Sequence, residues 1–298
     1  MLVVMAGASG LIGTALRRSL ESDGHTVRRL VRRQPASPDE VRWDPVAEPS
    51  SAWVAGAEVI VNLAGAPLGG QRWTRGYKSL LLRSRIDSAH MLAVAAAAAH
   101  RPPRVMISAS GIRFYGVDRG DEVLGESASG VADGFLPTVT RAWEEATSPA
   151  SAAGIAVCHL RLGLVVSRYG GFLPRLLPMF RVGLGATLGS GSEFWSYVSL
   201  ADAVRAIRFL MARPGAEGPY NIAVPNPIRS RAFTHALASA IGKQALLRVP
   251  TGLLRVAMGQ VGPEVLGSLR VVPTRLTEAG FESWHPDIAS VLDDALHH

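Results

Sequence analysis

Three glycines near the start of the chain have the spacing of a loop that binds a dinucleotide diphosphate. In "VMAGASGLIG" they are Gly7, Gly10 and Gly13, where an apolar run ends and a helical pattern begins. Backbone N–H groups at the start of such a helix, together with the helix dipole, favour an anion. Gly7 permits the tight turn, Gly10 lets the backbone approach the phosphates, and Gly13 lets the helix pack closely on the strand. The alternative interpretation is a glycine-rich turn that binds nothing.

The residues after the next predicted strand indicate which dinucleotide this loop would hold. An acidic residue at that position would bind the ribose 2′-hydroxyl of NAD. The segment "LVRRQP" has Arg32 and Arg33 instead, and a guanidinium can pair bidentately with a 2′-phosphate. We therefore predict that NADP(H) is preferred over NAD(H). The alternative is that both arginines are ordinary surface charges.

These residues need strands and helices in alternation to bring them to one edge of a sheet. Apolar strand-like segments and amphipathic helix-like segments do alternate through the first half of the chain. The pattern predicts an α/β protein with a Rossmann-type, doubly wound parallel sheet. The expected strands are 2–7, 25–31, 57–65, 104–110 and 155–166, and the expected helices are 9–24, 75–99 and 137–147.

Glycine and proline become frequent after residue 167, where neither a long helix nor a central strand is expected. We predict a Rossmann domain over 1–166, to which a segment at about 196–224 returns. We predict a smaller interleaved substrate lobe over 167–195 and 225–298, with two or three helices in its final part.

The composition limits the classes of function. The net charge of +7 is carried by scattered arginines, which predicts no nucleic-acid partner. The single cysteine, Cys158, excludes an intrachain disulfide and a cysteine-based metal site, and we expect it to be a small buried residue in a strand. The histidines show no metal-ligand spacing, so no metal is predicted. We expect a cytoplasmic protein without a membrane segment, and we leave a homodimer open.

The motifs together resemble the extended and atypical short-chain dehydrogenases/reductases. "GASGLIG", "NLAG" at 62–65 and "SASGIRFYG" at 108–116 are similar to motifs of the superfamily. "RAWEEA" at 141–146, the glycine-rich stretch from 170 and "RVVPTRLTEAGF" are similar to one branch. That branch comprises the epimerase-family proteins, also labelled nucleoside-diphosphate-sugar epimerase-like or cell-division-inhibitor-like. Its characteristic C-terminal domain would here include roughly 248–295.

The resemblance implies a set of cofactor-binding residues. The diphosphate would be held at the glycine loop and the 2′-phosphate at Arg32, while the strand end at 63–65 would pass the adenosine half. Arg85 would reach the cofactor from the following helix, and Ser108 and Leu164 would end strands near the nicotinamide. The implied set is Gly7, Ser9, Gly10, Leu11, Ile12, Gly13, Arg32, Leu63, Ala64, Gly65, Arg85, Ser108 and Leu164, to which we add Arg33.

The chain departs from the typical superfamily in its catalytic residues. Typical members use a Tyr-x-x-x-Lys pair, in which the ammonium lowers the pKa of the phenol. The only two lysines, Lys78 and Lys243, follow a threonine and a serine by four residues, so the pair is missing. The remaining candidates are Ser110 and Tyr115. Ser110 is either a substrate or nicotinamide contact or a turn cap, and Tyr115 is either a general acid or an aromatic of the pocket wall.

Two acidic residues in the helix expected over 137–147 are interpreted as part of a solvated helix face. Glu144 and Glu145 are adjacent, and adjacent helical positions face apart. Two hypotheses on function therefore stay open. The first is an NADP-dependent oxidoreductase or epimerase-like enzyme for a small carbonyl or alcohol substrate, nucleotide-sugar-like among the options. The second is a non-catalytic NADP-binding regulator or redox sensor that signals through a protein partner.

Overall fold

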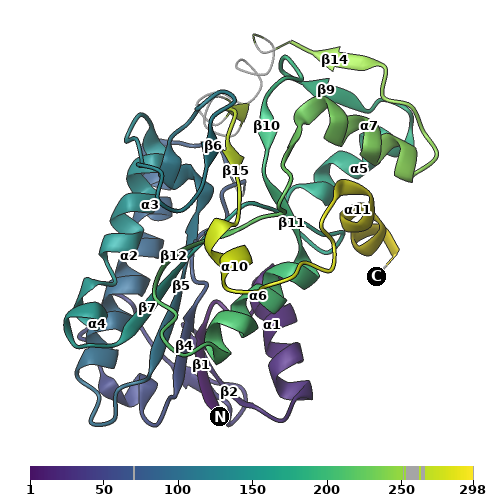
Figure 1. The fold of residues 1–298 in the computed structure, drawn as a ribbon. Coiled ribbons are helices and arrows are strands. Elements are labelled where there is room, and N and C mark those ends of the chain that lie inside the picture. The colour runs from purple at the N-terminus through teal and green to yellow at the C-terminus, as the bar shows by residue number, and fades with distance from the viewer. Residues whose placement is uncertain (70, 251, 253–261, 263–265, 298) are drawn as a thin grey trace. The chain divides into compact units, whose positions relative to one another are not determined.

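The computed structural model describes residues 1–69, 71–250, 252, 262 and 266–297. A seven-stranded sheet has the order β3-β2-β1-β4-β5-β7-β12, and neighbouring strands from β3 to β5 run parallel. This order confirms the predicted Rossmann-type sheet (Figure 1). The strands are β1 (Leu2–Ala6), β2 (Thr26–Val31), β3 (Glu40–Arg42), β4 (Val59–Asn62), β5 (Val105–Gly111), β7 (Ala156–Leu162) and β12 (Gly218–Ile222).

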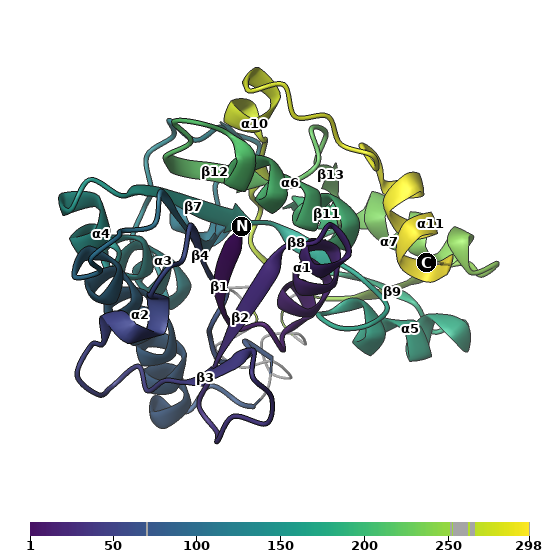
Figure 2. The same cartoon turned by 90° about the horizontal axis from the view of Figure 1, so that it is seen from below.

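Helices cover both faces of the sheet, which explains why its central strands are apolar throughout. Helix α1 (Leu11–Ser22) lies on one face, and α2 (Arg75–Ala97) and α4 (Ser148–Ala152) lie on the other (Figures 1 and 2). α1 buries Gly13, Leu16 and Leu20, at the spacing of three and four residues that one helix face requires. α2 begins at Thr74, whose hydroxyl accepts a hydrogen bond from the Tyr77 N–H.

Two local features differ from the sequence expectations. The short strand β3 at the sheet edge was not predicted, because three residues carry too little alternation to be recognised. The expected strand 155–166 is two strands, β7 and β8 (Leu164–Val166), and β8 pairs with β11 (Tyr197–Ser199). A Cβ atom at the intervening Gly163 would lie 2.7 Å from the Ser196 carbonyl oxygen, so the chain passes close to another backbone there.

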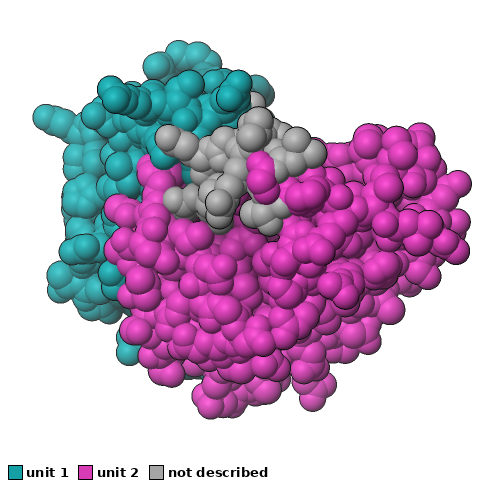
Figure 3. Space-filling model, turned by 90° about the horizontal axis from the view of Figure 1, so that it is seen from above, with its two compact units in different colours: residues 1–110, 139–160, 207–219 teal, residues 111–138, 161–206, 220–298 magenta. Residues whose placement is uncertain are grey.

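The chain divides into two compact units, coloured separately in Figure 3. Unit 1 comprises residues 1–110, 139–160 and 207–219, and unit 2 comprises 111–138, 161–206 and 220–298. The predicted domains assign residues 111–138 and 161–166 to the Rossmann domain, whereas these residues belong to unit 2, and the domain boundaries stay a prediction. Within the predicted lobe, residues 251, 253–261, 263–265 and 298 lie outside the described residues.

Unit 2 has its own aromatic core. Trp195 and Tyr197 both contact the ring of Phe233, with centroids 5.3 Å apart for Trp195 and Phe233. Helices α5 (Leu173–Arg181), α7 (Ser230–Ala240) and α11 (Ile288–His297) contribute apolar residues to this core. Its short strand pairs are β6 (Val123–Leu124) with β15 (Arg270–Val271), β9 (Ala186–Leu188) with β14 (Leu247–Val249), and β10 (Phe194–Trp195) with β13 (Ile228–Arg229).

The other helices are α3 (Phe135–Glu145), α6 (Leu200–Ala212) and α10 (Thr274–Glu278), with 3₁₀ turns at Ser51–Val54 and Ile112–Tyr115. Among the described residues, no helix has both the length and the apolar content needed to cross a bilayer. Cys158 lies in β7 and is fully buried, and its thiol donates to the Ala216 carbonyl at 3.2 Å.

Candidate functional site

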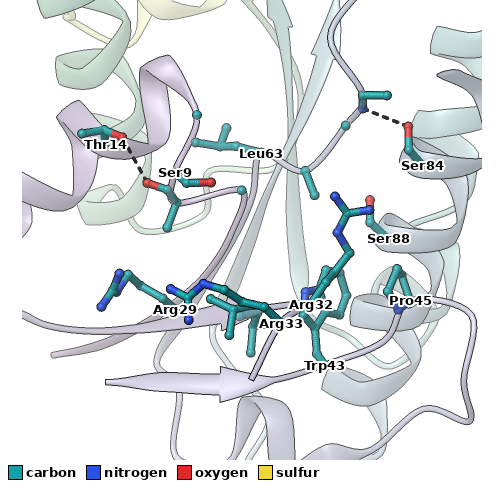
Figure 4. Close-up of a pocket in the computed structure, with 18 of the residues that line it drawn as sticks. Ser9, Thr14, Arg29, Arg32, Arg33, Trp43, Pro45, Leu63, Ser84 and Ser88 are labelled. Carbon is teal, nitrogen blue, oxygen red and sulfur yellow. Dashed lines mark hydrogen bonds between the residues drawn. The ribbon is translucent and has the colours of Figure 1, made fainter. Parts of the chain in front are cut away.

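A cavity of about 850 Å³ in unit 1 lies where the glycine loop, the end of β2 and the end of β4 meet (Figure 4). Seven of its lining positions combine loop backbone with basic and aromatic side chains from neighbouring segments. These are Gly7, Ser9, Gly10, Arg32, Arg33, Trp43 and Leu63, and the same wall continues through Ala64 and Gly65. The cavity therefore lies at the carboxyl edge of the parallel strands, where open α/β sheets bind their ligands.

The glycine loop can form only with glycine at two of its positions. Gly7 has a φ of 78°, and a Cβ atom there would lie 2.5 Å from the backbone of Leu63. A Cβ atom at Gly13 would lie 2.2 Å from the Gly7 carbonyl oxygen. These distances fit the predicted tight turn and the predicted close packing of α1 on the loop.

The first turn of α1 leaves its backbone donors available to a ligand. Gly10 precedes the helix and supplies no side chain to cap it, and Leu11, Ile12 and Gly13 form its first turn. The free N–H groups of such a turn suit a diphosphate. The cradle of glycines and these donors together fit the dinucleotide that the loop predicts.

Arg32 and Arg33 differ in what they contact. Arg32 makes no hydrogen bond or ion pair with any other described residue, and in Figure 4 its side chain rises toward Ser88. The two terminal nitrogens of Arg33 instead donate to both carboxylate oxygens of Glu40, at 2.7 and 2.6 Å. Arg32 is thus the arginine of the pair that is ready to receive an anion.

Glu40 is an acidic residue in this cavity that the sequence analysis did not find. It starts β3, lies beside Arg29 in the sheet register, and its side chain is 1% exposed. Hydrogen bonds from Arg33 and from the Ala36 N–H hold the pKa of Glu40 below its usual value, and Arg29 lies 3.0 Å away. No acidic residue directly follows β2 in the sequence, but the fold brings Glu40 from β3 into the cavity.

Arg85 has a different place from the one that the resemblance implies. Its guanidinium donates to the Leu81 and Ala66 carbonyls and lies 5.1 Å from the centre of the Trp143 ring. Burial lowers its pKa to about 10. Arg85 is not among the residues that line the cavity and supports the loop after β4, while its contact with a cofactor stays a prediction.

Polar atoms without partners lie at the ends of β4 and β5. Asn62 and Ser108 are neighbours in the sheet register and are fully buried. The Asn62 amide nitrogen and the Ser108 hydroxyl have no hydrogen-bond partner, and neither has the Trp143 indole N–H. Buried polar groups are usually satisfied, so these atoms fit a strand edge that receives a bound molecule. Ser108 itself does not line the cavity.

Ser110 is hydrogen-bonded to the carboxylate of Glu144, a residue expected from the sequence to lie on a solvated helix face. Its hydroxyl donates to Glu144 at 2.7 Å, and both residues belong to unit 1. The Glu144 side chain is 10% exposed, so the expectation of a solvated position was wrong for Glu144, whereas Glu145 is exposed. The two acids face apart as adjacent helical residues must, and this places one of them against β5.

Tyr115 lies in unit 2, and its hydroxyl is satisfied inside that unit. The residue is fully buried, donates to Asn221 at 2.7 Å and accepts from Arg161 at 3.0 Å. Burial raises the pKa of the phenol. This geometry favours the interpretation of Tyr115 as a structural aromatic residue. A role of Tyr115 as a general acid stays a prediction. Leu164 also belongs to unit 2, where it pairs with Tyr197, and its cofactor contact stays a prediction as well.

In the described part of the chain, no three or more His, Cys, Asp or Glu side chains gather in a way that could hold a metal ion.

Comparisons with known proteins agree with the geometry. A model of the NAD-dependent epimerase/dehydratase family matches residues 3–223, and a domain of unknown function, DUF1731, matches 249–295. An epimerase family protein of Mycobacterium bovis is 39% identical over 292 residues, 97% of this chain and 96% of that protein. The mouse epimerase family protein SDR39U1 is 32% identical and covers 99% of this chain and 100% of its own.

Two solved structures are similar over nearly the whole chain. The human epimerase family protein SDR39U1 with NADPH has a TM-score of 0.91 at 25% identity and covers 99% of both chains. A nucleoside-diphosphate sugar epimerase from Corynebacterium glutamicum has a TM-score of 0.83 at 32% identity, over 99% of this chain and 58% of that one.

Proposed function

Because the chain belongs to the NAD-dependent epimerase/dehydratase family, we propose that it is an NADP(H)-dependent oxidoreductase or epimerase-like enzyme. Its substrate would be a small carbonyl or alcohol compound, with nucleotide sugars as one class to test. Beyond its family, the protein would prefer the phosphorylated cofactor and would turn over a substrate.

One observation carries the cofactor preference. Arg32 lines the cavity and forms no ion pair within the described chain, while its neighbour Arg33 is occupied by Glu40. A guanidinium left unpaired beside a glycine-loop cavity is suited to a phosphate dianion. The presence of NADPH in the similar human SDR39U1 structure supports the same choice.

Different residues of unit 1 would bind different parts of the cofactor. When bound, NADP(H) would supply the hydride transfer, which no side chain can supply. The first turn of α1 and Ser9 would hold the diphosphate, and Arg32 would hold the 2′-phosphate. Trp43 is 4% exposed and lines the cavity, so it would form part of the apolar wall at the adenosine half.

The cofactor preference is tested by titration of NADPH and NADH, followed by nucleotide fluorescence. We expect NADPH to bind more tightly, and Arg32→Ala to raise its Kd about 10- to 100-fold, as the loss of a hydrogen bond to a charged group implies. NADH affinity should change little. Arg42→Ala removes an exposed arginine that does not line the cavity and serves as the control. Equal Kd values for the two nucleotides would contradict the preference.

Turnover is tested by following NADPH absorbance with a panel of aldehydes, ketones and quinones, and NADP⁺ reduction with UDP-glucose. Steady turnover supports the enzyme. The buried Tyr115 hydroxyl and the missing Tyr-x-x-x-Lys pair favour a second candidate function, a cofactor-dependent regulator. Tight NADPH binding with no turnover, together with capture of a protein partner only in the presence of NADPH, would favour that second function.

A further inference from the structure

A chain of polar side chains connects the end of β5 with α3 and β7, and its members Ser110, Glu144 and His159 all belong to unit 1. Ser110 donates to one carboxylate oxygen of Glu144 at 2.7 Å. The other carboxylate oxygen lies 4.0 Å from Nδ1 of His159, and Nε2 of His159 lies 2.9 Å from the Thr147 hydroxyl. A hydroxyl, a carboxylate and an imidazole thus follow one another from the strand edge into the unit.

The direction of the first hydrogen bond determines what Ser110 can do. A carboxylate has no proton to donate, so the hydroxyl hydrogen of Ser110 must point to Glu144. The lone pairs of the Ser110 oxygen are then left to accept. An alcohol substrate placed at this oxygen would donate its hydroxyl proton to Ser110, which is the direction needed for removing that proton.

The second hydrogen bond fixes the tautomer of His159. The Thr147 hydroxyl has one hydrogen, and it donates this hydrogen to the Glu144 carbonyl at 2.7 Å. At His159 the same hydroxyl must therefore accept, so the proton of the neutral ring lies on Nε2. The Nδ1 atom of the neutral ring then carries no proton, and it lies 4.0 Å from Glu144.

We propose that Ser110, Glu144 and His159 form the acid–base path of this protein and take the place of the missing Tyr-x-x-x-Lys pair. This inference rests on the proposed oxidoreductase or epimerase-like function. Ser110 is the catalytic residue that touches the substrate oxygen, Glu144 is the group that accepts and returns the proton, and His159 is a second base 4.0 Å beyond Glu144.

The proposed reaction is the oxidation of an alcohol, with NADP⁺ as the oxidant. In the oxidation of an alcohol, the C–H bond at the carbinol carbon breaks, and its electron pair leaves with the hydrogen to reduce NADP⁺. The O–H bond breaks at the same time, its proton passes to Ser110, and the Ser110 proton passes to Glu144. The substrate becomes a carbonyl compound, and in the reverse direction Glu144 returns the proton through Ser110 to the oxygen of the new alcohol.

Glu144→Gln tests the path because glutamine keeps the size and an acceptor oxygen for Ser110 but takes no proton at neutral pH. We expect kcat with NADPH and phenanthrenequinone or nitrobenzaldehyde to fall about 100-fold or more, the usual contribution of a general acid or base. The Kd of NADPH should change less than about 2-fold. Ser110→Ala should lose a similar part of the rate. Glu144→Asp restores a carboxylate and should recover part of it.

The matched control is Glu145→Gln, one position along the same helix and exposed. It should keep the wild-type rate. Equal rates of wild type and Glu144→Gln would overturn the path and leave the proposed enzyme standing. A wild-type protein that binds NADPH but turns over none of these probes would overturn the path and the proposed catalytic function together.

A measurement without turnover tests the same path. Nitrogen NMR of the ¹⁵N-histidine-labelled protein, with the His159 signals assigned by a His159→Gln variant, should show the Nε2–H tautomer. The Nδ1–H tautomer would mean that His159 donates to Glu144 and has no lone pair toward it, which would overturn the arrangement proposed here.

Discussion

Neighbouring arginines in the sequence have different roles in the folded cavity. Arg32 lacks a partner in the described chain, whereas Arg33 and Arg29 surround the buried carboxylate of Glu40. An acid near the adenosine ribose normally selects NAD, but here two guanidinium groups occupy it. The arginines were predictable from the sequence because they follow a strand directly. Glu40 was not, because it becomes a neighbour only through the pairing of β2 with β3.

Opposite effects are expected from the two partners of this ion pair. Arg33→Ala should release the Glu40 carboxylate into the cavity and remove a positive charge, so the ratio of the NADH Kd to the NADPH Kd should fall about 3-fold or more. Glu40→Gln should release Arg33 toward the 2′-phosphate and raise the ratio. Titration with both nucleotides measures this ratio. The control is Glu58→Gln, an exposed acid next to the amino end of β4. A shift in the same direction for both variants would indicate a structural role only.

The roles of the two catalytic candidates, Ser110 and Tyr115, depend on hydrogen-bond partners that the sequence does not reveal. Ser110 and Tyr115 were both candidates on the sequence because both lie in the same motif. The structure gives Ser110 a carboxylate partner in unit 1 and encloses Tyr115 between Asn221 and Arg161 in unit 2. Glu144 could not be singled out from the sequence, because its contact with Ser110 joins residues 34 positions apart.

At the scale of elements, the loop from β1 to α1 was the most predictable part of the site. Its function depends on backbone geometry, and backbone geometry at glycine positions can be read from the sequence. The shorter elements were less predictable. The strand β3 is too short to show periodicity, and the break at Gly163 depends on the approach of Ser196 from a distant part of the sequence.

Gly13→Ala should weaken both the fold and the cofactor site. The added Cβ atom would lie 2.2 Å from the Gly7 carbonyl oxygen, so α1 must move away from the loop. Overpacking of this kind typically costs about 1–3 kcal/mol of the free energy of unfolding. Thermal melting and NADPH titration would both detect it. Gly76→Ala, in the first turn of α2 with nothing within 4 Å, should leave both unchanged or raise stability slightly. No change in Gly13→Ala would contradict the close packing inferred for the loop.

At the scale of the whole molecule, the alternation of strands and helices was sufficient to predict the sheet, and the family comparison agrees over residues 3–223. The division into units was harder to predict, because chain segments from both halves of the sequence contribute to each unit. Hydrophobic periodicity is a local property, whereas the membership of a compact unit depends on contacts between distant segments.

Acidification should destabilise the protein below about pH 5. Hydrogen bonds from Arg29, Arg33 and Arg229 lower the pKa values of Asp39, Glu40 and Asp121 respectively. The folded pKa values lie below the unfolded values of about 3.9 for Asp and 4.3 for Glu, so the stabilisation is fully present above the unfolded values and is lost as the pH falls from these values through the folded ones. Urea unfolding at neutral pH and at about pH 3.5 should show a lower midpoint in acid. An unchanged midpoint would contradict this linkage.

The burial of Cys158 gives the molecule a chemical reporter that needs no engineering. Its thiol lies inside β7 and is bonded to the Ala216 carbonyl, so a thiol reagent in solution has no access to it in the closed sheet. It is the only cysteine in the chain, so any modification must occur at this one atom. The rate of modification therefore measures how often this part of the sheet opens, and a bound cofactor that strengthens unit 1 would slow the reaction.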